Sequence, residues 1–445
     1  MAITQEEIAR AGVVGAGGAG FPTHVKLSGK ADAVVLNVAE CEPLLHKDKE
    51  LVLRDASRIV RGLSRAAELV GAKEAVVGIK AKYERVVDAM EAALPKNMRV
   101  APLPDAYPAG DEFVLVYLTL GRVIAPGAIP LSVGAVVLNA ETAWNLAAVG
   151  ETPVVDKFVS VAGAVANPCT TRVPIGTPLR ECLRMAGGAT IPNPAYVIGG
   201  VMMGRLANSL DLPVTKTTGG LIVLPDDHFI VKRKSWDWNQ TARVGRASCD
   251  QCSRCTELCP RYMLGHPIEP HRAMRSLGFN ASREADVAGT QFCSECNLCS
   301  YCSCPEGLDP RGVNHQNKAR LAAEKKRWTN PPFHPERADL LYSFRKTPTH
   351  RLMQRVGLDG FVNKGPLLDG ECRPAFVEIL LRQHIGAPCS PLVQKGDVVS
   401  RGQPIAIRPV VDGKTALGAD VHASIDGVVM ETTEESIKIA ATSSV

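Results

Sequence analysis

Apolar runs and helical periodicities alternate along the first third of the chain. Residues 33–39 form an apolar, β-branched run that predicts a buried strand, and residues 75–79 form a second one. Apolar side chains recur at helical spacing from Val52 to Val70, and Gly71 stands where a helix C-cap is expected. A further helix is predicted over residues 83–94. Strands and helices that alternate at these lengths indicate a parallel α/β sheet with right-handed crossovers.

The hydrophobic pattern changes three times further along the chain. Residues 155–225 follow the order strand, turn, strand, helix, strand and contain no cluster of ionisable residues, which favours a structural module. Short helical turns between cysteine-rich loops come next, with a helix expected over 268–279 and a basic helix over 315–328. After residue 358, short β segments are separated by glycine turns. We therefore expect a multi-domain α/β protein with domains at residues 1–150, 151–228, 229–330 and 331–445.

Composition narrows the class of protein. The chain has 445 residues, of which 45% are hydrophobic and 22% charged, as in an ordinary globular protein. Its net charge of +5 is small, and no basic run is interleaved with aromatic residues, so nucleic-acid binding is not indicated. No apolar stretch approaches the roughly 20 residues of a membrane-spanning helix. The first ten residues lack a secretory signal pattern, which favours a cytoplasmic location.

Nine of the fourteen cysteines fall between residues 249 and 304, in two near-copies of one pattern. Each copy has three cysteines at x2 spacing followed by a Cys-Pro pair. In bacterial ferredoxins with two [4Fe–4S] clusters, this pattern supplies three ligands to one cluster and the fourth to the other. One cluster is therefore expected on Cys249, Cys252, Cys255 and Cys304, and the second on Cys293, Cys296, Cys299 and Cys259.

The second copy departs from the usual spacing, which leaves one ligand open. Its Cys-Pro cysteine, Cys304, follows Cys299 after four residues, and Cys302 lies between them. Pro305 favours Cys304, and Cys302 remains the alternative ligand. Zinc sites also use C-x2-C pairs, but they need two pairs rather than two runs of three. The pattern therefore favours clusters, and with them electron transfer.

A glycine-rich loop precedes the first predicted strand. Gly15, Gly17, Gly18 and Gly20 lie within residues 13–26 and leave a backbone that can approach a phosphate or a flat ring closely. Such a loop alone is weak support for nucleotide binding, since a plain turn has the same composition. Its position before the strand also differs from the usual dinucleotide fingerprint, in which the glycines follow the strand.

Four short motifs, taken in order, resemble the flavin-binding subunit of respiratory complex I and the C subunit of Rnf-type electron-transport complexes. They are the glycine loop ending at Lys26, Asn37-x-x-Glu40-x-Glu-Pro, Tyr107-x-x-Gly110-Asp111-Glu112, and Asn139-x-Glu-Thr142. Asp111 replaces the first glutamate of the family's third motif. By this resemblance, the FMN and NADH site is expected to include Gly15, Gly17, Gly18, Gly20, Lys26, Asn37, Glu40, Tyr107, Gly110, Asp111, Glu112, Asn139 and Thr142.

The resemblance also implies roles for these residues. The glycines and Lys26 would hold the FMN phosphate and flank its ring, and Asn37, Asn139 and Thr142 would add polar contacts. Glu40 and Glu112 are expected to be the catalytic carboxylates that face the nicotinamide.

The remaining segments extend the resemblance over nearly the whole chain. Residues 155–225 resemble the β-grasp (SLBB-like) module of the same proteins. The C-terminal β segments resemble the barrel-sandwich hybrid fold of lipoyl and biotinyl carriers, but residues 422–426 at the predicted hairpin tip include no lysine for a prosthetic group. Rnf C subunits carry this domain at the N-terminus. Its position after the cysteines resembles the cobalamin reductases of propanediol-utilisation microcompartments.

This family implies an NADH-dependent oxidoreductase in which electrons pass through FMN and two [4Fe–4S] clusters to cobalamin. It also implies a bacterial microcompartment as the location, with a corrinoid adenosyltransferase and shell proteins as candidate partners. No Asp-x-His-x-x-Gly corrinoid signature occurs, so contact with cobalamin is expected to be transient. The alternative is an Rnf-like relay subunit that passes electrons to a partner protein or across a microcompartment shell.

Overall fold

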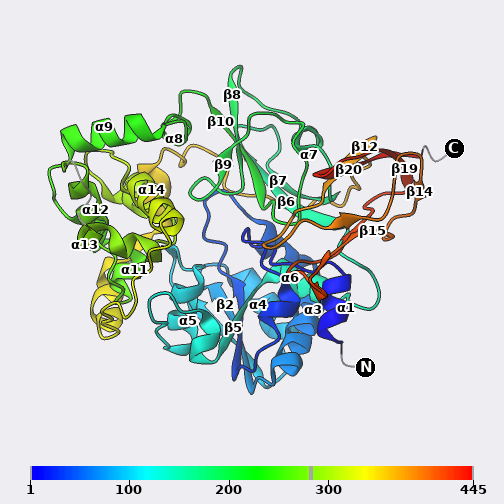
Figure 1. Ribbon diagram of the computed structural model, residues 1–445, viewed down its shortest axis with the longest axis horizontal. Coiled ribbons are helices and arrows are strands. Elements are labelled where there is room, and N and C mark those ends of the chain that lie inside the picture. The colour runs from blue at the N-terminus through cyan, green and yellow to red at the C-terminus, as the bar shows by residue number, and fades with distance from the viewer. Residues whose placement is uncertain (1–2, 280–283, 443–445) are drawn as a thin grey trace.

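The computed structural model describes residues 3–279 and 284–442. The N-terminal α/β domain lies at the centre of the lower half in Figure 1, with the cysteine-bearing helices to one side and the C-terminal β domain to the other. The small mixed sheet lies above it. Among the described residues, the structure contains no helix that combines the length and apolar character needed to cross a membrane.

The N-terminal domain is built on a four-stranded parallel sheet in the order β3-β2-β1-β5, which confirms the predicted fold class. Its strands are β1 (Ala33–Val38), β2 (Glu74–Lys80), β3 (Met98–Leu103) and β5 (Ala135–Asn139). Its helices are α1 (Gln5–Arg10), α2 (Thr23–Lys26), α3 (Lys47–Val70), α4 (Glu84–Ala93), α5 (Glu112–Leu120) and α6 (Ala140–Leu146). Helix α3 ends at Gly71, whose φ of 70° is the left-handed C-cap conformation that glycine adopts without strain.

The second sheet has five strands in the order β7-β6-β10-β8-β9. It comprises β6 (Asp156–Gly163), β7 (Cys169–Pro174), β8 (Pro194–Ile198), β9 (Arg205–Leu206) and β10 (Gly220–Pro225), with α7 (Leu179–Met185) packed against it. Only the β6–β10 pair is parallel among these strands. The predicted succession of elements is present, with β9 and β10 completing the sheet.

The cysteine-bearing segment is helical. It contains α8 (Phe229–Lys234), α9 (Trp238–Ser248), α10 (Arg254–Glu257), α11 (Pro260–Met263), α12 (Pro270–Ser276), α13 (Glu284–Val287) and α14 (Pro310–Ala323). Helix α14 differs from the helix predicted over 315–328. It starts earlier because Asp309 caps its N-terminus by accepting from the Gly312 N–H and Pro310 occupies the first turn. It ends at Ala323, before the lysine run.

The C-terminal part begins with β11 (Thr347–Pro348), which pairs with β4 (Ala106–Tyr107), and with α16 (Thr349–Arg355). Its four-stranded sheet contains β12 (Phe376–Leu380), β20 (Ser436–Ala441), β19 (Gly427–Thr432) and β14 (Val398–Val399). A three-stranded sheet contains β13 (Ser390–Pro391), β15 (Pro404–Ile407) and β18 (Val421–His422). The apolar faces of both sheets contribute to one core.

The C-terminal domain docks directly on the glycine loop of the N-terminal domain. The Ile385 N–H donates to the Gly20 carbonyl at 3.0 Å, and the Asp420 N–H donates to the Ala9 carbonyl at 3.0 Å. The Arg408 guanidinium pairs with Glu6 at 2.9 Å across the same contact. The C-terminal domain therefore contacts both the glycine loop, at Gly20, and helix α1 before it.

Candidate functional site

The glycine loop lies beside the carboxyl ends of β1 and β5. These strands are parallel neighbours, and their register pairs Asn37 with Asn139 at that edge. The strand order reverses direction at this point, since β2 and β3 lie on one side of β1 and β5 on the other. In open α/β sheets, ligands bind in the crevice at such a switch point.

The loop itself fits a phosphate or a flat ring. Gly18 and Gly20 have φ values of 115° and 66°, a backbone region that favours glycine. Within the described residues, the N–H groups of Gly17, Gly18 and Ala19 donate to no protein acceptor, and all three residues are exposed. A side chain at Gly18 would meet nothing within 4 Å. Exposed backbone N–H groups that have no acceptor within the protein and face open space are suited to binding an anion.

Polar side chains from the other motifs surround this cradle. The Thr142 hydroxyl accepts from the Ala16 N–H at 2.9 Å, and a Cβ on Gly17 would lie 3.6 Å from Asn139. Asn139 caps α6, and its amide also donates to Asp48 at 2.7 Å. The Asn37 amide donates to the Gly110 carbonyl at 2.8 Å. The structure thus brings residues of all four motifs to one edge of the sheet.

Lys26 and Glu112 form an ion pair at this edge. The Lys26 ammonium lies 2.6 Å from the Glu112 carboxylate and also donates to the Val137 carbonyl at 2.9 Å. Their side chains are 27% and 43% exposed, so both groups remain accessible to a ligand. The predicted phosphate cation and the predicted catalytic acid are therefore direct neighbours.

Glu40 lies at the N-terminus of α3 in an unusual backbone conformation. Its φ is 36°, and its carboxylate accepts from the N–H groups of Asp48 at 2.6 Å and Lys49 at 3.3 Å. Burial, followed by the charge of Asp48, raises the pKa of Glu40 to about 7. A carboxyl group that titrates near neutral pH can exchange a proton with a ligand under working conditions.

A buried charged cluster beneath the loop was missed by sequence reasoning. Glu141 lies 2.5 Å from the Lys157 ammonium and 3.1 Å from that of Lys47, and all three side chains are at most 4% exposed. Lys157 also donates to the Ala16 carbonyl at 3.2 Å, so the cluster holds the loop from below. Burial lowers the pKa of Lys157 to about 8. A lysine within an otherwise apolar strand was the signal in the sequence.

Tyr107 and Asp111 connect this edge to the cysteine-bearing segment. The Tyr107 hydroxyl donates to the carbonyl of Cys296 at 2.8 Å. Asp111 caps α5, and its other oxygen accepts from the Arg261 guanidinium at 2.9 Å. Their side chains thus contact the cysteine-bearing segment rather than the glycine loop.

The cysteines fall into two groups, which we call the inner group (Cys259, Cys293, Cys296 and Cys299) and the outer group (Cys249, Cys252, Cys255 and Cys304). Burial and the neighbouring thiols of Cys304, Cys249 and Cys252 raise the pKa of Cys255 to about 12. Burial raises the pKa of Cys259 to about 12, with Cys293 adding to the shift. Cys249 and Cys304 pack against one apolar cluster and Cys302 against another; burial raises the pKa of Cys302, and Arg355 opposes that change. This separates Cys302 from the outer group.

The two groups differ in solvent exposure. In the inner group Cys259, Cys296 and Cys299 are buried, whereas Cys252 of the outer group is exposed and Cys249 and Cys304 are half-buried. Across residues 3–279 and 284–442, no three His, Cys, Asp or Glu side chains converge closely enough to hold a single metal ion. Ligands of an iron–sulfur cluster surround several atoms, so this spacing is compatible with clusters.

Models of known families match each of the four parts of the chain described under the overall fold. The family model described as the Nuo51 FMN-binding domain matches residues 8–148, and the SLBB domain matches 158–206. A 4Fe-4S dicluster domain matches 248–309, and the RnfC barrel sandwich hybrid domain matches 369–444. The chain is thus a multi-domain oxidoreductase with FMN and [4Fe–4S] clusters as cofactors.

Full-length relatives identify the family. The chain is 44% identical over 438 residues to "Cobalamin reductase PduS" of Salmonella typhimurium (strain LT2), covering 98% of this chain and 96% of the relative. It is 33% identical to the C subunit of the Na(+)-translocating ferredoxin:NAD(+) oxidoreductase complex of Acetobacterium woodii, over 58% of this chain and 57% of that one. A solved NAD+-reducing [NiFe]-hydrogenase aligns with a TM-score of 0.48 and 20% identity, over 77% of this chain and 65% of that one. The chain belongs to the family of PduS cobalamin reductases.

Proposed function

We propose that this protein oxidises NADH and delivers the electrons, one at a time, to cobalamin. The observation that carries the proposal is the direct connection between the two halves of the molecule. The motif that contributes Glu112 to the sheet edge also holds the inner cysteine group, through Tyr107 and Asp111. A hydride acceptor at that edge and an electron carrier at those cysteines would therefore be neighbours in the folded protein.

We assign the sheet edge to FMN and NADH. The exposed N–H groups of the glycine loop would bind the FMN phosphate, with Lys26 supplying positive charge, and Asn37, Asn139 and Thr142 would fix the ring. Bound FMN supplies the chemistry that the side chains lack, because a flavin takes two electrons together and releases them singly. Glu40 and Glu112 would orient the nicotinamide, and the near-neutral pKa of Glu40 suits it to hold or release a proton.

We assign one [4Fe–4S] cluster to each cysteine group. Cys304 is the ligand of the outer cluster because its thiol is near those of Cys249 and Cys252, whereas Cys302 is near neither. Cys259 joins the inner group across the sequence, as the pattern of bacterial two-cluster ferredoxins predicts. The same exchange of the fourth ligand would hold the two clusters close together.

Anaerobic reconstitution with iron, sulfide and FMN tests the function. With NADH as donor, the loaded protein should reduce cob(III)alamin and cob(II)alamin, and removal of FMN should abolish both reactions. Reduction of ferredoxin without any reduction of cobalamin would contradict the proposal and support the relay alternative. NADPH tested at equal concentration determines the choice of nicotinamide.

We also propose that the protein acts inside a propanediol-utilisation microcompartment, beside a corrinoid adenosyltransferase and shell proteins. This rests on the resemblance of the whole chain to that family and on the need to use reduced cobalamin before it reoxidises. Purified microcompartments should contain the protein in a protease-protected form. Its absence from that protected fraction would contradict this location.

A further inference from the structure

The two cysteine groups define a direction along the molecule. The inner group contacts the flavin-binding domain through Tyr107 and Arg261, whereas the outer group is the more exposed of the two. Electrons that enter from the sheet edge would therefore reach the inner group first and leave from the outer group. An acceptor should then bind beside a cysteine of the outer group.

A cavity of about 490 Å³ lies at that position. Three segments line it: the start of α8 with Phe229, the turn from Ser300 to Gly307, and the end of α16 with Gln354 and Arg355. Cys304 itself forms part of the wall, and none of the other three outer cysteines does. The cavity thus touches the outer group through Cys304 alone.

The walls of the cavity are built from well-fixed groups. The His228 ring bonds the Gly357 carbonyl at 3.1 Å, and the Arg355 guanidinium donates to the Cys304 carbonyl at 3.2 Å. The Phe229 ring packs edge-on against Tyr301, with centroids 5.9 Å apart, and remains 38% exposed. The lining includes no aspartate or glutamate. Apolar rings and hydrogen-bond donors around a space of this size are typical of a small-molecule site.

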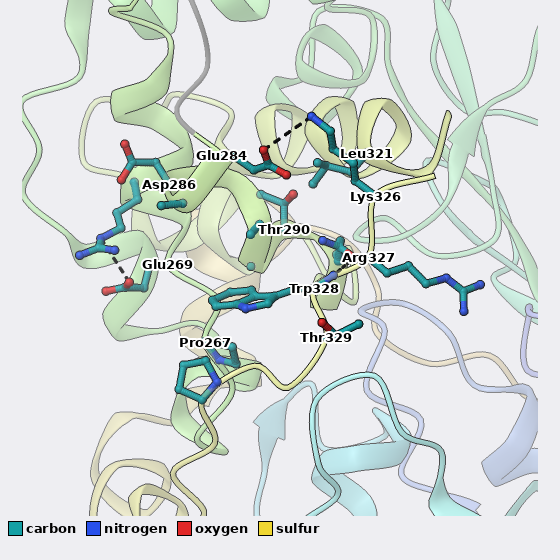
Figure 2. Close-up of a pocket in the computed structure, with 16 residues that line it drawn as sticks. Pro267, Glu269, Glu284, Asp286, Thr290, Leu321, Lys326, Arg327, Trp328 and Thr329 are labelled. Atoms are coloured by element: carbon teal, nitrogen blue, oxygen red, sulfur yellow. Dashed lines mark hydrogen bonds and ion pairs between the residues drawn. The ribbon is translucent and has the colours of Figure 1, made fainter. Parts of the chain in front are cut away.

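The molecule has a second cavity in this segment, which differs in chemistry. It measures about 570 Å³, and Figure 2 shows Trp328 on its wall with Glu269, Glu284 and Lys326 around it. The Glu284–Lys326 pair at 3.6 Å and the Arg272–Glu269 pair at 3.2 Å lie in its lining, which unlike that of the first cavity contains carboxylates. None of the nine clustered cysteines lines it. It therefore lacks direct contact with either cysteine group.

We propose that the cavity beside Cys304 is the binding site for the corrinoid substrate. The proposal rests on the proposed function. The cavity is smaller than a whole corrinoid, so it would take one edge of the corrin ring, whose amide side chains match the Arg355 and Gln354 groups in the lining. Phe229 offers the exposed apolar surface for the ring edge. A shallow, partial fit accounts for the absence of a corrinoid signature in the sequence.

The reaction at this site balances as two one-electron steps. One electron converts cob(III)alamin to cob(II)alamin with loss of an axial ligand, and a second gives cob(I)alamin. One NADH supplies both electrons and releases NAD+ and one proton. The site needs no group that moves protons, which agrees with a lining without carboxylates.

A cavity-filling variant tests the site. Gln354 is exposed and lines the cavity, and the neighbouring Arg355 rather than Gln354 bonds Cys304, so Gln354→Trp should fill the space and leave the outer cysteines in place. The matched control is Arg351→Trp, also exposed on α16 but outside the lining. Phe229→Ala provides an independent variant on another wall, with the exposed Phe344→Ala as its control.

The readouts are equilibrium binding of hydroxocobalamin to the loaded protein, the KM and kcat for cobalamin, and the paramagnetic resonance signals of both reduced clusters. Gln354→Trp and Phe229→Ala should each weaken hydroxocobalamin binding about tenfold and raise KM, as expected when apolar contact is lost or blocked. The controls, the cluster signals and NADH oxidation by a dye should stay at parent levels.

Unchanged hydroxocobalamin binding in both Gln354→Trp and Phe229→Ala would overturn the proposed corrinoid site. An equal loss of binding in the Arg351→Trp control would overturn it too. Weaker binding in Trp328→Ala alone would assign the corrinoid to the cavity beside Trp328 instead. If Gln354→Trp disturbs the outer cluster signal, hydroxocobalamin binding by Phe229→Ala decides whether the corrinoid binds in this cavity. A parent protein that binds hydroxocobalamin but never reduces it with NADH would refute the proposed function and leave the binding site intact.

Discussion

The inner and outer cysteine groups have nearly the same sequence pattern but different surroundings. Three inner cysteines are buried, and the group is held to the flavin-binding domain by the Tyr107 hydrogen bond and the Arg261–Asp111 ion pair. The outer group has an exposed member, Cys252, and a half-buried one, Cys304, that lines a cavity. On the path proposed above, what surrounds each cysteine group, rather than its ligand motif, would set its place in the order of electron transfer.

Loss of flavin removes the input to both groups and should have the largest effect. A side chain at Gly17 would lie 3.6 Å from Asn139, an ordinary contact, so Gly17→Val should fold but occupy the face of the glycine loop. We expect loss of FMN and of all NADH oxidation, with both cluster signals still generated by dithionite. Flavin content and paramagnetic resonance check this. Full FMN occupancy in Gly17→Val, or in Lys26→Ala, would contradict the site.

Replacement of one cluster-ligating cysteine should distinguish the roles of the two cysteine groups. Cys304→Ala should abolish the outer cluster and reduce cobalamin turnover to background, because the exit carrier is missing, while NADH oxidation by a two-electron dye persists. Cys302→Ala is the matched control, since Cys302 packs against a different apolar cluster from the one that Cys249 and Cys304 contact. Iron content and paramagnetic resonance distinguish the variants. A lost cluster in Cys302→Ala with a normal pair in Cys304→Ala would reverse the ligand assignment.

Weakening the connection to the inner group should have an intermediate effect. Arg261 pairs with Asp111, and its guanidinium lies 3.5 Å from the Phe113 ring centroid. Both charged side chains are close to 10% exposed, and breaking such a buried pair costs about 3–5 kcal/mol. Arg261→Met should lower thermal stability and slow cobalamin reduction more than dye reduction. The exposed Arg243→Met on α9 should do neither; equal slowing of both reactions would show that the contact is only structural.

Much of the fold could be predicted from local sequence. The β-branched runs specify buried parallel strands, and Gly71 specifies the end of α3, because strand burial and helix capping depend on neighbouring residues. The contacts that join the halves could not be predicted. Tyr107 bonds a carbonyl 189 residues away, and nothing near either residue in the chain encodes that pairing.

The buried charges show a second limit. From the sequence alone, a lysine in a strand such as Lys157 is expected to face solvent. Its side chain is instead 1% exposed and pairs with Glu141. Only the packing of the second sheet against α6 makes that position internal. The glycine loop could be recognised from its residues, but the cluster that supports it from below required the structure.

The smallest expected effect is on the pH dependence of stability in the flavin-binding domain, the domain that the inner cysteine group contacts. The pKa of Glu40 is raised to about 7 in the folded protein, from an ordinary value of 4.5, by burial and by Asp48. The folded state therefore holds this proton more tightly than the unfolded chain. The resulting stabilisation is complete below about pH 4.5 and is lost as pH rises to about 7. Glu40→Gln should flatten the change in melting temperature between pH 5 and 7.5; an unchanged profile would show that Glu40 does not titrate there.

The order of the two groups is the central claim, and rapid freezing after mixing with NADH tests it most directly. Two loaded variants are compared by paramagnetic resonance: Cys304→Ala, which keeps the inner cluster, and Cys296→Ala, which keeps the outer one. We predict that NADH reduces the inner cluster of Cys304→Ala at the parent rate and reduces the outer cluster of Cys296→Ala far more slowly. Reduction of the outer cluster at the parent rate in Cys296→Ala would contradict this order.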